Sequence, residues 1–65
     1  MIDHHWHGSP AAVADAMADR PNVIGPRMLD GTAYVCVRAD VPLDTPPGLS
    51  ETGLELSALV LGVWA

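Results

Sequence analysis

Three histidines near the start of the chain are the residues whose chemistry is easiest to recognise. His4, His5 and His7 surround Trp6, and an extended backbone would place His5 and His7 on one face. Imidazole is a common zinc ligand, so the cluster raises the question of a metal site. The set is incomplete, because no Cys or carboxylate stands nearby with ligand spacing. We therefore expect no metal and no cofactor. Ile2 and Trp6 should pack on the core, while the histidines lie at the surface or form local hydrogen bonds.

The single cysteine is the other candidate for reactivity. Cys36 cannot form a disulfide within the chain, which is compatible with a reducing compartment. It has no histidine partner in sequence or spacing, so we expect a small, partly buried apolar residue rather than a nucleophile. The sequence also lacks a glycine-rich phosphate loop followed by Lys, and a serine nucleophile elbow. We expect no enzymatic activity and no catalytic residues.

The charge balance restricts the kinds of partner. Eight acidic residues face three arginines and no lysine, which gives a formal net charge of −5. Affinity for nucleic acid comes mainly from cations that neutralise phosphates, so direct nucleic-acid binding is not expected. An excess of carboxylates suits a partner with a basic surface, although the same charge also serves solubility. The candidate partner-binding residues are the acids expected on the helix surface and in loops: Asp15, Asp19, Asp30, Asp40, Asp44 and Glu51.

The first regular element that the sequence predicts is a helix from Pro10 to about Arg20. Ser9 is a preferred N-cap residue, and the proline after it loses only an N–H that would be unpaired in any case. Pro21 disfavours the helical conformation of the residue before it and ends the helix. Asp15 and Asp19 are four residues apart, so such a helix would present both carboxylates on one face.

A β-hairpin is predicted next. Residues 22–29 and 32–38 read as two strands, and Asp30-Gly31 between them is a strong signal for a two-residue turn. Pro26 cannot donate to a strand ladder, so the first strand should lie at a sheet edge or carry a bulge. After a proline-rich connection, Leu49-Ser50 can add a short third strand.

The end of the chain, residues 53–65, is almost entirely apolar. Thr52 and Glu55 have the spacing of a capping box, which predicts a helix from about Gly53. A helix that is apolar on nearly all sides must be buried, so we expect the rest of the chain to surround it. A central strand is the alternative, because periodicity does not separate short apolar runs. The run is too short for a membrane span, and no membrane association is expected.

Together these elements predict one small α+β domain over residues 1–65. It would contain an N-terminal helix, an antiparallel hairpin of two or three strands, and a buried C-terminal helix. No signal peptide is recognised, so we expect a cytoplasmic protein, and we expect a monomer. Leu59→Ala should cost about 2–5 kcal/mol. The predicted core consists of Val13, Met17, Val35, Val37, Leu56, Leu59, Val60 and Val63.

From Met1-Ile2-Asp3-His4-His5-Trp6 to Gly62-Val63-Trp64-Ala65, the chain resembles the small phage-encoded anti-CRISPR proteins of the type I-C inhibitor group. These proteins share no common motif, so no residue roles carry over. The resemblance implies a non-enzymatic inhibitor that binds the type I-C surveillance (Cascade) complex in the bacterial cytoplasm and blocks engagement of target DNA. Its carboxylates would meet the basic DNA-binding surface of a complex subunit.

The C-terminal residues from Leu56 to Ala65 also resemble the ends of small proteins from phage tail-gene neighbourhoods. This second resemblance implies an accessory virion protein that acts by packing rather than by charge. A competing account of binding follows from it, in which an apolar patch around Trp6 or Trp64 makes the contact.

Overall fold

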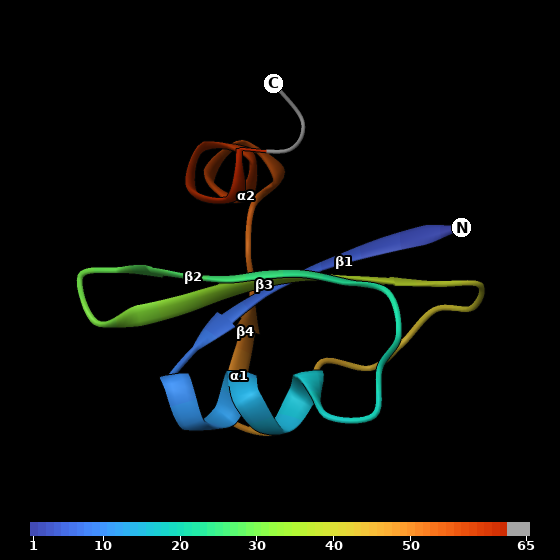
Figure 1. Ribbon diagram of the computed structural model, residues 1–65. Helices are drawn as coiled ribbons and strands as arrows, with labels where there is room; N and C mark the ends of the chain where they lie inside the picture. The colour runs from blue at the N-terminus through green and yellow to red at the C-terminus, as the bar shows by residue number, and fades with distance from the viewer. Residues whose placement is uncertain (63–65) are drawn as a thin grey trace.

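The computed structural model describes residues 1–62 and contains a four-stranded antiparallel sheet with one helix on each face (Figure 1). The strand order is β2-β3-β1-β4. The predicted α+β class is confirmed. The elements are β1 (Ile2–Gly8), α1 (Pro10–Met17), β2 (Val23–Leu29), β3 (Thr32–Ala39), β4 (Leu49–Glu51) and α2 (Leu54–Leu61).

Strand β1 lies in the interior of the sheet and was not predicted as an element. It pairs with β3 along its whole length, from Ile2 opposite Ala39 to Gly8 opposite Ala33, and with β4 on its other side. Because successive side chains of a strand point to opposite faces, Trp6 points to the α1 side while its neighbours His5 and His7 point to the α2 side. The histidine cluster is therefore divided between the two faces of the sheet.

Helix α1 begins as the sequence predicts. The Ser9 hydroxyl accepts a hydrogen bond from the Ala12 N–H at 3.2 Å, and the proline stands at the first helical position. The helix ends earlier than predicted, at Met17: Ala18 leaves the helical conformation with a ψ of 138°, and the Arg20 side chain folds back and donates to the Ala16 carbonyl at 2.7 Å. Asp19 lies beyond the helix with a left-handed φ of 63°. The prediction that Asp19 shares a helix face with Asp15 is therefore wrong.

The hairpin of β2 and β3 is confirmed. Asp30 and Gly31 have φ angles of 51° and 79°, the two consecutive left-handed residues of a type I′ turn. The register of β2 shifts between Ile24 and Arg27, so this edge strand also carries the bulge expected at its proline. The short third strand predicted at Leu49-Ser50 is also confirmed, as β4.

The principal core lies between the sheet and α1. Trp6, Val13, Ala33, Val35 and Val37 form one buried cluster, and partly buried apolar residues pack against it. The predicted core positions Val13, Val35 and Val37 are confirmed, and Met17 packs at the edge of the cluster. Trp6, the largest side chain of this cluster, is 1% exposed.

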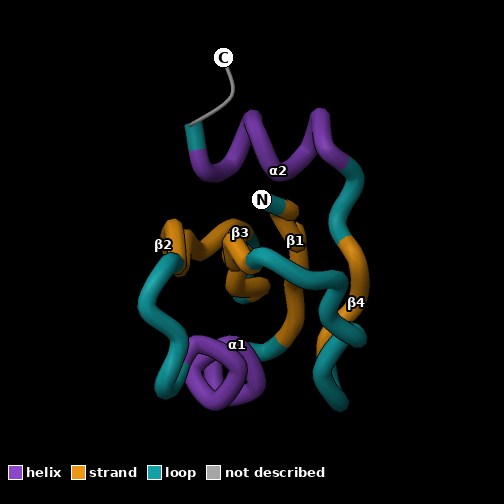
Figure 2. The backbone as a smooth tube through the Cα atoms, turned by 90° about the vertical axis from the view of Figure 1, so that its right-hand side faces the viewer, coloured by secondary structure: helices purple, strands orange, loops and turns teal. Residues whose placement is uncertain are grey.

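Helix α2 covers the opposite face of the sheet, where it contacts β2 and β3 (Figure 2). Of its residues, Ser57 and Leu61 are buried. Leu54, Leu56 and Leu59 are 60%, 39% and 80% exposed, so the prediction of a buried central helix is wrong. One layer of sheet can bury only one stripe of a helix, so Leu56 and Leu59 face outward, while Ala58 and Val60 are half-buried at the sides of that stripe.

The start of α2 also differs from the prediction. Its N-cap residue is Gly53, and no side chain caps it, so the predicted capping box of Thr52 and Glu55 does not form. Of the other predicted core positions, Val60 is half-buried and Val63 lies outside the described residues. Neither described helix is long and apolar enough to cross a membrane.

Candidate functional site

The face of the sheet beneath α2 carries polar side chains from β1 and β3. The cross-strand register places three pairs of residues directly opposite one another: Asp3 and Arg38, His5 and Cys36, His7 and Tyr34. All six side chains share this face, because residues two apart on a strand point the same way. The rings of His7 and Tyr34 stack with their centroids 5.5 Å apart.

Three of these residues bring potential metal ligands together. One carboxylate oxygen of Asp3, one ring nitrogen of His5 and the Cys36 sulfur lie within 4.8 Å of one another. Cys36 is fully buried, and the other two side chains are half-buried. The prediction that Cys36 has no histidine partner is wrong. So is the premise that no Cys or carboxylate accompanies the histidines, because Asp3 shares the strand with His5 and Cys36 lies directly across from it.

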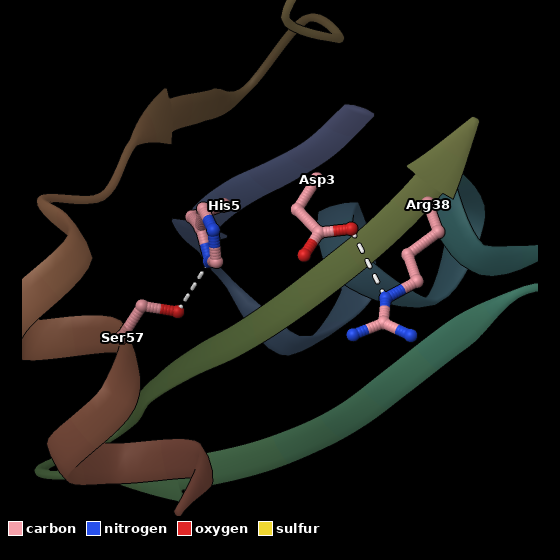
Figure 3. Close-up of polar contacts among 4 residues, drawn as sticks. All are labelled: Asp3, His5, Arg38 and Ser57. Carbon is pink, nitrogen blue, oxygen red and sulfur yellow. Dashed lines mark hydrogen bonds and ion pairs between the residues drawn. The ribbon is translucent and has the colours of Figure 1, made fainter. Parts of the chain in front are cut away.

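Two histidines of β1 connect the sheet to α2 and to the segment before it. A hydrogen bond of 2.7 Å joins Nδ1 of His5 to Oγ of Ser57, which is 1% exposed (Figure 3). A second, of 2.8 Å, joins Nδ1 of His7 to Oγ1 of Thr52. Since Thr52 is used in this way, it does not cap α2. These bonds join residues 52 and 45 positions apart in sequence, so they are not the local bonds that were expected.

Asp3 also forms an ion pair on this face. The Arg38 Nε lies 3.0 Å from the Asp3 Oδ1, and both side chains are partly exposed to solvent (Figure 3). An ion pair of this exposure contributes at most about 1 kcal/mol to stability. It does fix the orientation of the carboxylate beside His5.

The electrostatics of the site follow mainly from burial. Burial lowers the pKa of His5, Asp3 opposes this change, and His4 adds to it. Burial raises the pKa of the Cys36 thiol to about 11; Asp3 adds to the rise and Arg38 opposes it. Cysteine nucleophiles work as thiolates with lowered pKa values, so this thiol is not activated for attack.

The predicted acidic residues do not gather on one surface. Asp30 and Asp40 flank the two ends of β3, which places them roughly 25 Å apart at about 3.3 Å per residue. Asp19 and Asp40 line one depression, in which Arg20 and Arg38 also stand. Asp15 is exposed on α1, on the far side of the sheet from α2. Glu51 lines another depression, beside Asp3 and His5, and Asp44 is exposed in the connection before β4.

A further surface that the sequence analysis missed is the outer face of α2, where Leu56 and Leu59 are exposed; Leu54 is exposed at the start of the helix, on the same stripe as buried Ser57 and Leu61. The sequence pattern signals an apolar helix but does not say which of its sides the sheet covers. The proposed patch around Trp6 is wrong, because this side chain is 1% exposed. Trp64 lies outside the described residues.

Comparisons with protein-family models, with curated protein sequences and with solved structures found no match to this chain.

Proposed function

We propose that this protein acts by binding another protein, without catalysis, and that its partner is a basic, DNA-binding subunit of a type I-C CRISPR surveillance complex. Binding would block the engagement of target DNA. The observation that carries the binding role is the outer face of α2, where Leu56 and Leu59 are exposed one turn apart, with exposed Leu54 at the start of the same helix. Clustered exposed apolar side chains are typical of interaction sites, whereas single ones are common on any surface.

The energy available from this face is sufficient for an interface core. Burying one leucine side chain contributes about 1.5–3 kcal/mol, so Leu59 alone can change an affinity by about 10-fold to 100-fold. Glu55 is exposed one turn before Leu59, and residues four apart are neighbours on a helix surface. A complementary partner would therefore offer an apolar groove with basic residues at its rim.

The choice of partner rests on charge and on the resemblance described above. The net charge of −5 without any lysine favours a cationic protein surface, and the rows of basic residues that hold DNA are such a surface. A partner seated on α2 would meet Glu55 first. Asp15 lies on the other side of the sheet and would remain outside this contact.

The test measures the affinity of the purified chain for a purified type I-C surveillance complex. Leu59→Ser should weaken binding at least about 10-fold without unfolding the domain, because the side chain is 80% exposed. Val41→Ser is the matched control, since Val41 is 59% exposed but lies outside α2. Glu55→Lys should weaken binding more than Asp15→Lys, and added salt should weaken binding of the parent.

Two outcomes would contradict parts of this proposal. If the parent chain does not bind the surveillance complex, the partner is wrong. If Leu59→Ser binds like the parent while reversal of Asp19 and Asp40 to Lys abolishes binding, the contact is made by carboxylates on another surface.

The exposed leucines also favour a second candidate, an accessory virion protein that packs onto a phage tail component. An interface made mainly by apolar packing changes little with ionic strength, whereas exposed charge pairs are screened within about 8–10 Å. Binding to a purified tail protein that persists at high salt and is lost in Leu59→Ser would support this candidate over the first.

A further inference from the structure

We propose that Asp3, His5 and Cys36 bind a single Zn²⁺ ion between the sheet and α2. Their ligand atoms lie within 4.8 Å of one another, and the three residues provide a carboxylate oxygen, an imidazole nitrogen and a sulfur. This site is separate from the outer face of α2 and does not depend on the proposed function.

The spacing of the ligand atoms is close to that of a zinc site. Zinc bonds of about 2.0–2.3 Å in a tetrahedron place neighbouring ligand atoms roughly 3.3–3.8 Å apart. The largest separation allowed here is 4.8 Å, so an inward movement of about 1 Å closes the site. Asp3 and His5 are half-buried and can supply this movement by small side-chain rotations, while buried Cys36 stays in place.

The kinds of donor select the metal. Thiolate and imidazole ligands favour zinc over magnesium or calcium, which prefer oxygen. As the zinc–sulfur bond forms, the Cys36 thiol loses its proton to solvent, because a coordinating thiol is deprotonated by the metal. Three protein ligands leave the fourth tetrahedral position for a water molecule.

The surroundings of the three ligands also suit a metal ion. We assign the ligand role to Nε2 of His5, because Nδ1 lies 2.7 Å from Ser57 Oγ and metal-binding histidines usually make such a hydrogen bond through the ring nitrogen that does not touch the metal. Arg38 pairs with Oδ1 of Asp3, which leaves Oδ2 for coordination. Asp3 and His5 line a surface depression together with Glu51 and Thr52, and this depression gives an ion a path to the site.

The other two histidines serve as internal controls. His7 lies on the same strand and the same face, but its Nδ1 is bonded to Thr52 and it is not part of the ligand cluster. His4 points to the opposite face, where its ring stacks on Trp6 with the centroids 5.5 Å apart. Replacing either histidine should therefore leave the affinity of the proposed site for zinc unchanged.

The experiment uses untagged protein that has been stripped with a chelator and then titrated with Zn²⁺ by calorimetry and with Co²⁺ by absorption. We expect one ion per chain and a thiolate-to-cobalt charge-transfer band in the near ultraviolet. Asp3→Asn, His5→Gln and Cys36→Ser should each lower the affinity at least about 100-fold, more than the loss of an outer-shell partner. Ser57→Ala should lower it about 10-fold to 100-fold, and His7→Gln should leave it unchanged.

Circular dichroism of each metal-free variant establishes that it is folded before it is titrated. Asp3→Asn is nearly isosteric and half-buried, so it tests the site independently of whether Cys36→Ser folds. The proposal is overturned if folded parent protein gives no thiolate-to-cobalt band. It is equally overturned if binding survives Asp3→Asn and Cys36→Ser but is lost in His4→Gln or His7→Gln, which would indicate adventitious binding by histidines.

Discussion

At the scale of single residues, Trp6 organises the α1 side of the sheet. Its indole is 1% exposed, the Arg20 guanidinium carbon lies 5.7 Å from the ring centroid, and His4 stacks on it. A cation–π contact of this kind contributes about 0.5–1 kcal/mol, and the burial of the ring contributes more. His4 Nε2 is buried and has no hydrogen-bond partner among the described residues, so its place beside Trp6 rests on packing.

Val35 is buried and Leu59 is mostly exposed, so their truncation should change the free energy of unfolding by different amounts. Val35→Ala should lower the free energy of unfolding by about 2–3 kcal/mol, because it removes two buried methyl groups and leaves a cavity under α1. Leu59→Ala should change it by less than about 0.5 kcal/mol, because the side chain is mostly exposed. Urea titration of both variants measures the difference. A larger loss for Leu59→Ala than for Val35→Ala would contradict the placement of α2.

At the scale of elements, α2 is attached to the sheet by one buried polar residue and one buried apolar residue. Its buried residues are Ser57, which bonds to His5, and Leu61, which packs above Gly25 in the bulge of β2. Gly25 has a φ of 105°, and a Cβ there would lie 3.2 Å from the Leu61 side chain and 2.9 Å from the Tyr34 carbonyl oxygen. The bulge therefore provides both the backbone conformation and the space that this end of α2 requires.

Gly31 and Gly53 both have open space around them but should respond differently to replacement by alanine. Gly31 has a φ of 79° in the hairpin turn, whereas Gly53 before α2 has a φ of −61°. Gly31→Ala should destabilise the domain by about 1–2 kcal/mol, the cost of a left-handed conformation for a residue with a Cβ. Gly53→Ala should cost less than this, because its φ suits any residue and only the preference for Gly over Ala at an N-cap is lost. Thermal unfolding of the two variants side by side tests this, and equal melting temperatures would contradict the assigned turn.

At the scale of the whole molecule, three layers are stacked: α1, the sheet and α2 (Figure 2). The layers differ in chemistry. The α1 interface is built from Trp6 and valines, while the α2 side of the sheet carries His5, His7 and Cys36 and is bonded to Ser57 of the helix. Because the principal apolar cluster lies between the sheet and α1, most of the stability of this small domain should come from the α1 side.

The net charge leads to a prediction about self-association. Two copies that each carry −5 repel one another, so the 6.8 kDa chain should sediment as a monomer at low ionic strength despite its exposed leucines. Sedimentation velocity at several protein and salt concentrations measures this. A dimer that dissociates in Leu59→Ser would show that the outer face of α2 binds a second copy of the chain.

The sequence by itself determined those parts of the fold whose causes are local. Ser9 and Pro10 start α1 because an N-cap hydroxyl and a fixed φ act within one turn. Asp30 and Gly31 form the hairpin turn because both tolerate positive φ, and the bulge of β2 coincides with the proline that cannot join the ladder. These features depend on residues only a few positions apart.

The tertiary structure alone decided where α2 packs and which residues of β3 lie opposite β1. The apolar pattern of residues 53–65 is the same whether a helix fills a core or covers one face of a sheet, and only the packing of α2 on the face opposite α1 separates the two. In the same way, Cys36 acquires His5 and Asp3 as neighbours only because β1 pairs with β3 in a particular register. A shift of one residue would turn every side chain of β1 to the other face, and the local sequence does not fix that register.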